Sequence, residues 1–377
     1  MIRFLTAGES HGRGEVAIVE GVPSGMELSP KDIQEELAKR KGGSGRGGRG
    51  AIETDEVQIL SGVRFGKTIG SPIALFVENR DFSNWKGKMS KSKVTAPRPG
   101  HADLAGALKY GFRDVRNVLE RASARETVMR VAVGAIAKVF LSNFKVIVAS
   151  HTIQIGMAKV ERGNFPFETI AQVFTIDPQT RCIDEVARKK MQEEILLATK
   201  RKDTLGGIIE IIAHNVPPGL GSFVHYDRKL DGRISAALMS IPSVKAVEIG
   251  EGISNAGKFG SLVHDEIFFE KEHFVRKTNR AGGIEGGVSN GEDIICRVYH
   301  KPISTLGNPL RTIDIETRKE VPAAIERSDI CVVPRAGVIS ESMVAFILME
   351  SFLEKFGGDC LNETKRNFEG FKRQLVQ

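Results

Sequence analysis

Aromatic side chains are scarce in this 377-residue sequence, which has one Trp and three Tyr beside 20 Phe. Proteins that bind single-stranded nucleic acid usually stack bases on aromatic platforms, so this shortage disfavours that class. The four cysteines (Cys182, Cys296, Cys331 and Cys360) form no CxxC pair, and no H-E-x-x-H motif or Cys/His cluster occurs. The sequence therefore predicts reduced thiols, no metal centre and no disulfide scaffold.

Long hydrophobic runs are also missing. The apolar stretch around Val131–Leu141 is interrupted by Lys138 and is shorter than the ~20 residues that a spanning helix needs. Residues 1–6 give way at once to Gly, Glu, Ser and His, without the apolar region of a signal peptide. With 41% apolar and 27% charged residues, the composition is that of a globular protein, and we expect it to be cytoplasmic, with no membrane partner.

Positive charge is concentrated in one region. The chain has 54 Lys/Arg against 47 Asp/Glu, and residues 85–130 alone contain 11 Lys/Arg and four Asp/Glu. A basic region indicates a polyanionic partner, which is either nucleic acid or a small substrate with several acidic groups. A solvated surface is the simpler explanation for the lysines at 86–93.

Hydrophobic periodicity and turn residues predict mixed helices and strands in a single unit spanning 1–377, because no low-complexity linker divides the chain. Two short echoes suggest an internal duplication: Val16–Gly25 resembles Glu210–Gly219, and Gly62–Gly66 resembles Gly287–Gly291. Strands are predicted over 2–6, 15–20, 57–60, 72–78, 208–213 and Ile330–Val333, and helices over Pro30–Lys41, 102–112, 124–143, 184–200 and 229–240.

Two glycine-rich segments contain candidate functional residues. In Gly8–Gly14 the flanking glycines allow a sharp turn that exposes His11, which is either a general acid or a solvent-facing turn residue. Gly43–Gly48 matches GxGxxG, but a helix precedes it rather than a strand, so we reject the dinucleotide interpretation. The arginines at 40, 46 and 49 can bind carboxylate or phosphate, or form a short nucleic-acid segment.

Four further segments combine cations with loop or helix-start geometry. Arg98–Asp103 begins a helix after a proline-stiffened loop, and Arg121–Glu126 has the spacing of a capping box, which could bind an anion or serve capping alone. His300–Thr305 is a loop with a cation and hydroxyls, and Arg327–Asp329 has the form of a structural ion pair.

In combination, these motifs resemble the chorismate synthase family from residue 1 to about 352. The resemblance rests on their joint order and spacing, and it extends through Asn215–Gly221, Ala281–Gly287 and Lys301–Ser304. It implies an α+β fold, a β-α-β sandwich with helices between antiparallel sheets and an internal duplication. It also implies a homotetramer.

The resemblance implies a lyase of the shikimate pathway, which supplies aromatic amino acid biosynthesis. The reaction would be the 1,4-elimination of phosphate from 5-enolpyruvylshikimate-3-phosphate to give chorismate. Family members require reduced FMN, without net redox change. Because no nicotinamide motif is found, an external flavin reductant is expected and a flavin reductase is disfavoured. A basic nucleic-acid-binding protein is the remaining alternative.

The resemblance also implies roles for individual residues. His11 would protonate the departing phosphate, His101 would serve the N1 side of the flavin, and Asp329 would assist proton removal through the flavin N5. The substrate would contact Ser10, Arg40, Arg46, Arg49, Arg98, Ser123, Arg125 and Arg327. The flavin would contact Arg121, Ala122, Ser123, Pro242, Ser243, Gly286, Lys301, Pro302, Ile303, Ser304, Thr305 and Arg327. Pro242 departs from the usual family pattern, so backbone contacts would matter there.

Overall fold

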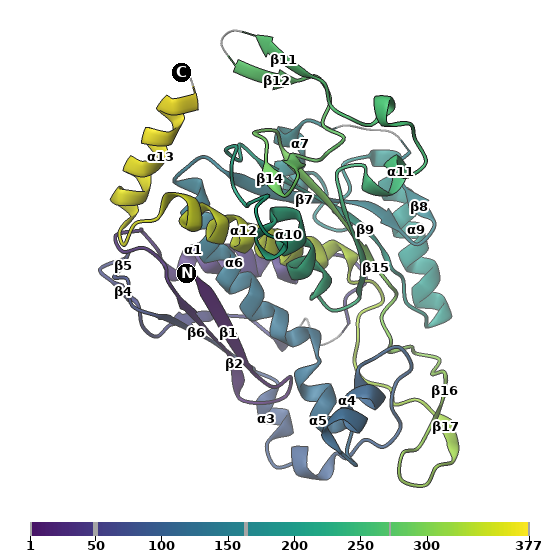
Figure 1. Ribbon diagram of the computed structural model, residues 1–377. Coiled ribbons are helices and arrows are strands. Elements are labelled where there is room, and N and C mark those ends of the chain that lie inside the picture. The colour runs from purple at the N-terminus through teal and green to yellow at the C-terminus, as the bar shows by residue number, and fades with distance from the viewer. Residues whose placement is uncertain (1, 48–51, 162–164, 271–272, 376–377) are drawn as a thin grey trace.

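Two antiparallel sheets organise the structure, a computed structural model that describes residues 2–47, 52–161, 165–270 and 273–375 (Figure 1). The first sheet has the strand order β1-β2-β6-β3, and all neighbouring strands in it are antiparallel. Its strands are β1 (Arg3–Gly8), β2 (Gly14–Glu20), β3 (Val57–Ile59) and β6 (Ile73–Glu78). Alternate side chains of β2 and β6 are buried, so one face of this sheet belongs to the core.

The second sheet has the order β10-β15-β9-β7-β8 and is also antiparallel throughout. Its strands are β7 (Ile147–Ile155), β8 (Ala158–Lys159), β9 (Gly207–His214), β10 (Val244–Ile249) and β15 (Ile294–His300). Of these strands only β9 was predicted. The others are short apolar runs of a kind that periodicity alone does not separate from buried helix.

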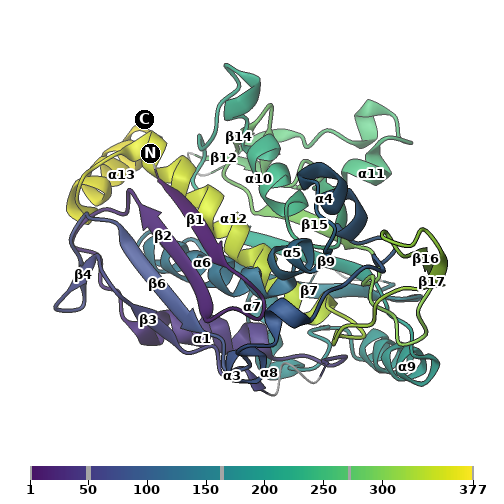
Figure 2. The same cartoon turned by 90° about the horizontal axis from the view of Figure 1, so that it is seen from below.

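Three helices lie between the sheets, as Figure 2 shows: α1 (Pro30–Lys41), α6 (Thr127–Ser142) and α12 (Val333–Phe356). Helix α6 packs on β2 and β6, α12 packs on β7 and β9, and the two helices pack on each other. They approach closely at Gly134, where an added Cβ would lie 2.2 Å from the Cβ of Ser342. A large cluster of buried apolar side chains spans both sheets and these helices.

The bounds of α1 are those predicted from the sequence. The Ser29 backbone N–H donates to Asp32 Oδ2 at 2.8 Å, and Pro30 occupies the first turn, where its missing N–H costs nothing. The predicted strand at Ile330–Val333 is wrong. Val333 begins α12, because Pro334 suits the first turn of a helix as well as it suits a strand end.

Helix α12 is also the one described helix long and apolar enough to cross a membrane. In its most apolar window, 83% of the residues are buried inside the protein. This burial is typical of a core helix, since its neighbours α6, β7 and β9 already cover its sides.

The remaining elements surround this arrangement. The polar loop predicted over 79–100 contains a short helix, α3, and a 3₁₀ turn at Met89–Lys91. The helices are α3 (Phe82–Trp85), α4 (Asp103–Tyr110), α5 (Arg116–Arg121), α7 (Phe167–Ala171), α8 (Val173–Ile176), α9 (Glu185–Arg201), α10 (Leu230–Met239), α11 (Gly252–Asn255) and α13 (Leu361–Leu375). The two-stranded pairs are β4 (Val63–Arg64) with β5 (Lys67–Thr68), β11 (Ile267–Glu270) with β12 (His273–Arg276), β13 (Ile284–Glu285) with β14 (Val288–Ser289), and β16 (Arg311–Ile313) with β17 (Glu320–Pro322). The predicted α+β class, with helices and antiparallel sheets, is confirmed.

Candidate active site

The turn between β1 and β2 presents two buried polar side chains. Ser10 is 2% exposed and His11 is 5% exposed. The predicted exposure of His11 is wrong, because side chains from outside the turn cover its ring. The side-chain amide of Asn79, just after β6, donates to the carbonyls of Glu9 and Gly12 at 3.1 and 3.0 Å. The Asn79 amide therefore bonds the backbone just before Ser10 and just after His11, which holds the turn in place.

A carboxylate and an indole enclose the imidazole of His11. Its Nδ1 lies 2.8 Å from Glu120 Oε1, and its backbone N–H donates to Glu120 Oε2 at 2.7 Å. The ring of Trp85 lies over the imidazole, with 4.0 Å between ring centroids. Burial alone would raise the pKa of Glu120, but hydrogen bonds from His11 outweigh it and lower that pKa below its ordinary value.

The two serines named as substrate ligands lie together. Ser10 Oγ donates to Ser123 Oγ at 2.9 Å, although 113 residues separate them in the sequence. Ser123 caps the 3₁₀ turn at Ala124–Glu126 by accepting the backbone N–H of Arg125 at 3.3 Å. Ser123 is therefore a cap, and its hydroxyl points to the His11 turn. The predicted box with Glu126 is not among the described contacts, because that carboxylate accepts from Thr6 and Arg130 instead.

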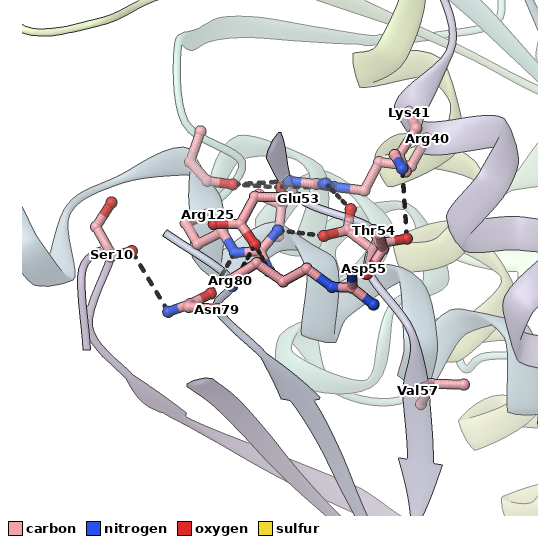
Figure 3. A network of polar contacts seen from close by, with 12 residues as sticks. Ser10, Arg40, Lys41, Glu53, Thr54, Asp55, Val57, Asn79, Arg80 and Arg125 are labelled. Carbon is pink, nitrogen blue, oxygen red and sulfur yellow. Dashed lines mark hydrogen bonds and ion pairs between the residues drawn. The ribbon is translucent and has the colours of Figure 1, made fainter. Parts of the chain in front are cut away.

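Arg125 and Arg40 form a buried network with carboxylates (Figure 3). Arg125 donates to Asn79 Oδ1 at 2.7 Å, pairs with Asp55 and lies 3.4 Å from Glu53 Oε2. Arg40 Nη1 lies 3.2 Å from the other oxygen of Asp55. Burial lowers the pKa of Arg40 to about 10. The predicted group of cations is thus partly balanced by acids.

A second cluster forms at the start of α4. Arg98 Nε lies 2.8 Å from Asp103 Oδ2, and Arg98 Nη1 donates to Thr305 Oγ1 at 2.9 Å. His101 Nδ1 lies 2.5 Å from Asp103 Oδ1. Burial opposes ionisation of Asp103, yet hydrogen bonds from His101 and Arg98 lower its pKa well below the usual range. The structure therefore brings Arg98, His101 and Thr305 to one place.

The Lys301–Thr305 loop continues this cluster. Lys301 Nζ donates to Ser304 Oγ at 2.9 Å, and a Cβ at Gly100 would lie 3.3 Å from that same oxygen. The Lys301 backbone N–H donates to the carbonyl of Ser243 at 2.9 Å. Ser243 Oγ in turn lies 2.9 Å from Nδ1 of His300, whose pKa burial lowers to about 4.

A cavity of about 440 Å³ groups four of the predicted flavin contacts. Arg121, Ala122, Ser123 and Pro242 line it, together with Phe4, Leu5, Thr6, Glu126, Arg130, Ser240 and Met343. We call it the Arg121 cavity. Gly286 is not among its lining residues; it is exposed in the β13–β14 turn, where an added Cβ would meet no described atom within 4 Å.

The C-terminal site residues are also paired. Asp329 forms an ion pair with Arg335 and accepts the backbone N–H of Gly47 at 2.7 Å. Arg327 forms an ion pair with Asp81. These contacts connect the glycine-rich loop after α1 and the loop after β6 to the segment that precedes α12. The ion-pair interpretation of Arg327–Asp329 holds, although each residue pairs outside that tripeptide.

Two of the predicted arginines lie in the glycine-rich loop. Arg46 is exposed on the segment next to Gly47, and its charge lies close enough to influence Arg335. Arg49 lies outside the described residues.

Sequence analysis missed the acids, the amide and the aromatic ring that hold the site together. Their partners are 15 to 246 residues away in the chain, so no local motif marks them. The only available signal was the excess of arginine, which requires counter-charges when it is buried. The missed residues are Glu53, Asp55, Asn79, Asp81, Trp85 and Glu120.

Buried arginines, two serines and two carboxylate-bound histidines on an α+β scaffold are typical of an enzyme that acts on a small anionic substrate. Known proteins identify which one. A family model described as chorismate synthase matches residues 2–353. The chain belongs to the chorismate synthase family, and the predicted resemblance is confirmed.

Individual relatives agree over the full length. The chain is 52% identical over 384 residues to the chorismate synthase of Carboxydothermus hydrogenoformans, with 100% of both chains covered. It is 52% identical over 390 residues to that of Koribacter versatilis, with 100% of this chain and 99% of that one covered. A crystal structure of a chorismate synthase matches with a TM-score of 0.82 and 41% identity, covering 100% of this chain and 98% of the other. The chain is thus an enzyme, a lyase of the shikimate pathway that serves aromatic amino acid biosynthesis.

Proposed function

We propose that the protein converts 5-enolpyruvylshikimate-3-phosphate to chorismate by 1,4-elimination, with reduced FMN as cofactor and no net redox change. The observation that carries this proposal is the meeting of Ser10, His11, Ser123 and Arg125 from separate segments. Each supplies a donor, and the substrate offers a phosphate and two carboxylates to accept them.

The substrate would extend arginine pairs that already exist. A guanidinium has five N–H donors, so an arginine bound to one carboxylate can still donate to a second anion. In this proposal the substrate contacts Ser10, Arg40, Arg46, Arg49, Arg98, Ser123, Arg125 and Arg327. The buried carboxylate of Asp55 keeps Arg40 and Arg125 apart from each other and oriented before the substrate arrives.

The hydrogen-bond donors proposed to hold reduced FMN lie in the Arg121 cavity, which Pro242 lines, and in the Lys301–Thr305 loop, which is bonded to the next residue, Ser243. The Arg121 cavity offers two guanidinium groups, Arg121 and Arg130, with the hydroxyls of Ser123 and Ser240. The Lys301–Thr305 loop lies beyond Ser243, to which it is hydrogen-bonded. Arg327 and Gly286 complete the proposed set, although neither lines the Arg121 cavity.

In this proposal, side chains of the protein donate and accept the protons that move in the reaction. When bound, reduced FMN supplies transient electron donation to the substrate, which weakens the C–O bond to phosphate. His11 donates a proton to the departing phosphate. His101, held by Asp103, would lie beside the flavin, and Asp329 would assist removal of the ring hydrogen.

An anaerobic assay tests the proposal. Purified protein with 5-enolpyruvylshikimate-3-phosphate and dithionite-reduced FMN is expected to form chorismate and phosphate in equal amounts. The same mixture with oxidised FMN and no reductant should form none, because the electron donor is missing. Chorismate formation without flavin, or none with reduced FMN, would contradict the proposal.

The proposed partners and location follow from the resemblance to the chorismate synthase family. The protein would work in the cytoplasm with an external flavin reductant, and without nucleic acid or membrane. We propose a homotetramer because the outer face of the first sheet is apolar: Leu5 and Ile18, which face each other across β1 and β2, are 69% and 45% exposed. A second subunit would cover such a face.

The sandwich of sheets and helices is proposed to arise from a duplication within a single domain, 1–377. In the first sheet β1 pairs with β2, β2 with β6, and β6 with β3, while in the second β7 pairs with β9, β9 with β15, and β15 with β10. A helix follows β2 and another follows β9, namely α1 and α10, and a long helix follows each sheet, α6 and α12.

Hydrogen bonds at the turn after β2 and after β9 support this duplication. The Thr68 hydroxyl donates to the carbonyl of Pro23 at 2.7 Å, and the Ser289 hydroxyl donates to that of Pro217 at 2.7 Å. The backbone N–H three residues after each proline donates to the same hydroxyl, at 3.0 and 2.8 Å. The first echo is therefore in register, whereas the second is shifted: the carbonyl of Gly66, not of Gly62, occupies the place of Gly287.

A further inference from the structure

Glu120 fastens the catalytic turn at three points. Its backbone carbonyl accepts the N–H of Ser10 at 2.9 Å, Oε2 accepts the N–H of His11 at 2.7 Å, and Oε1 lies 2.8 Å from His11 Nδ1. The side chains of Glu120 and His11 are each 6% exposed. Both carboxylate oxygens are thus used on one histidine, in a place where water competes little.

This geometry dictates which ring nitrogen of His11 carries a fixed proton. An ionised carboxylate only accepts hydrogen bonds, so Nδ1 must be the donor to Glu120. In the neutral ring Nε2 is then the bare acceptor, and in the imidazolium Nε2–H is the proton left to give. The atom that can exchange a proton with a bound phosphate is therefore Nε2.

Neighbouring groups hold the pair in this arrangement. Arg116 lies one helical turn before Glu120 on α5, with Nη1 3.5 Å from Glu120 Oε1. The same guanidinium lies over the ring of Trp85, 5.2 Å from its centroid, and Trp85 covers the imidazole. Arg116 Nη2 is anchored 3.0 Å from Glu326. The Glu120 carboxylate is therefore held in place by Arg116 independently of its bonds to His11.

We propose that Glu120 is a positioning residue that holds His11 in the Nδ1–H tautomer and so makes Nε2 the atom that delivers the proton to the leaving phosphate. The inference rests on the proposed function of His11. Glu120 contacts neither substrate nor flavin in this scheme and acts only through the imidazole.

The first test measures the tautomer in the unaltered protein. Two-dimensional ¹H–¹⁵N NMR of the ¹⁵N-histidine-labelled protein at a pH where His11 is neutral should show the proton on Nδ1, with the signal assigned by its loss in His11→Ala. A ring protonated at Nε2 would overturn the proposal. This measurement needs no active enzyme, so it stays decisive if the wild-type protein forms no chorismate and the proposed function fails.

The second test compares two matched substitutions. In Glu120→Gln the amide has one acceptor oxygen and a donor NH₂, so it cannot accept from both His11 N–H and Nδ1–H as the carboxylate does. The control is Glu210→Gln, because Glu210 is also a largely buried partner of a histidine, 3.2 Å from His151 Nε2, but lies on β9 outside the site.

We expect Glu120→Gln to lower the single-turnover rate at saturating substrate by about tenfold or more, with binding of substrate and reduced FMN changed by about twofold at most. Glu210→Gln should leave the rate within about twofold of wild type. Equal rates in the two variants, or a Glu120→Gln defect confined to substrate binding, would refute the positioning role. Should Glu120→Gln not fold, the tautomer of the unaltered protein decides.

Discussion

Removing Arg125 should damage the fold as well as substrate binding. This arginine is buried, with only 5% of its side chain exposed, and its three nitrogens reach Asn79, Asp55 and Glu53. Arg125→Ala removes a cation that faces two buried carboxylates, Glu53 and Asp55, although Arg40 still pairs with Asp55. It also removes a partner of the amide that holds the His11 turn.

The expected size follows from this burial. Removing one partner of a buried ionic network costs about 3–5 kcal/mol, because the remaining charges stay out of water. Whole domains are stable by about 5–15 kcal/mol. Arg125→Ala should therefore lose roughly a third or more of the free energy of unfolding. Arg125→Lys should lose less, since it keeps the charge but not the fork that reaches three acceptors.

Urea unfolding followed by far-ultraviolet circular dichroism measures this difference. The control is Arg113→Ala, which removes an exposed arginine and should change the free energy of unfolding by about 0.5 kcal/mol or less. If Arg125→Ala unfolds within about 1 kcal/mol of wild type, the carboxylate network does not depend on Arg125 and our reasoning fails. Such a result would return Arg125 to a role in ligand binding alone.

Three further predictions use other parts of the molecule. Arg46→Ala should weaken substrate binding about tenfold or more and make turnover more salt-sensitive, because one charge-assisted pair contributes about 1.5–3 kcal/mol; unaltered steady-state constants would remove Arg46 from the site. His101→Ala should change the absorbance of reduced FMN upon substrate binding whereas His11→Ala should not, and anaerobic stopped-flow spectra that are perturbed alike would show the division of roles to be wrong. Burial alone would raise the pKa of Glu36, but Lys138 at 2.6 Å and Lys39 outweigh it and lower that pKa from 4.5 to about 2. The ionised Glu36 therefore contributes fully to stability above about pH 4.5, and this contribution is lost as the pH falls through 2. Acid unfolding of Lys138→Met should show a smaller loss across that window, and an identical profile would contradict the linkage.

Local signals in the sequence were enough for the elements that begin with a cap. Helix α1 has its predicted bounds because Ser29 and Pro30 fix its first turn irrespective of the rest of the chain. The turn with Ser10 and His11 was likewise marked by its flanking glycines. Strands β7, β10 and β15 were not found, because each becomes a strand only by pairing with segments far away in the sequence.

In the site, too, local sequence signals and contacts between distant segments differ in what they allow us to predict. From the sequence we predicted a group of cations that binds carboxylate or phosphate. The structure instead pairs Arg125 with Asp55, Arg98 with Asp103, and Asp329 with Arg335. Which acid meets which arginine depends on how distant loops are brought together, and no spacing in the sequence encodes that.

The place of α12 between the sheets has a consequence for synthesis. Helix α6 is buried on nearly all sides, and one of its sides is covered by α12, which begins at Val333, 191 residues after α6 ends. At about 5–20 residues per second, a ribosome needs roughly 10–40 s to make that intervening chain. During this time α6 presents an apolar surface to the cell, and β7 and β9 lack their cover. The nascent chain is therefore most vulnerable to aggregation after the first sheet and α6 have been made and before α12 emerges from the ribosome.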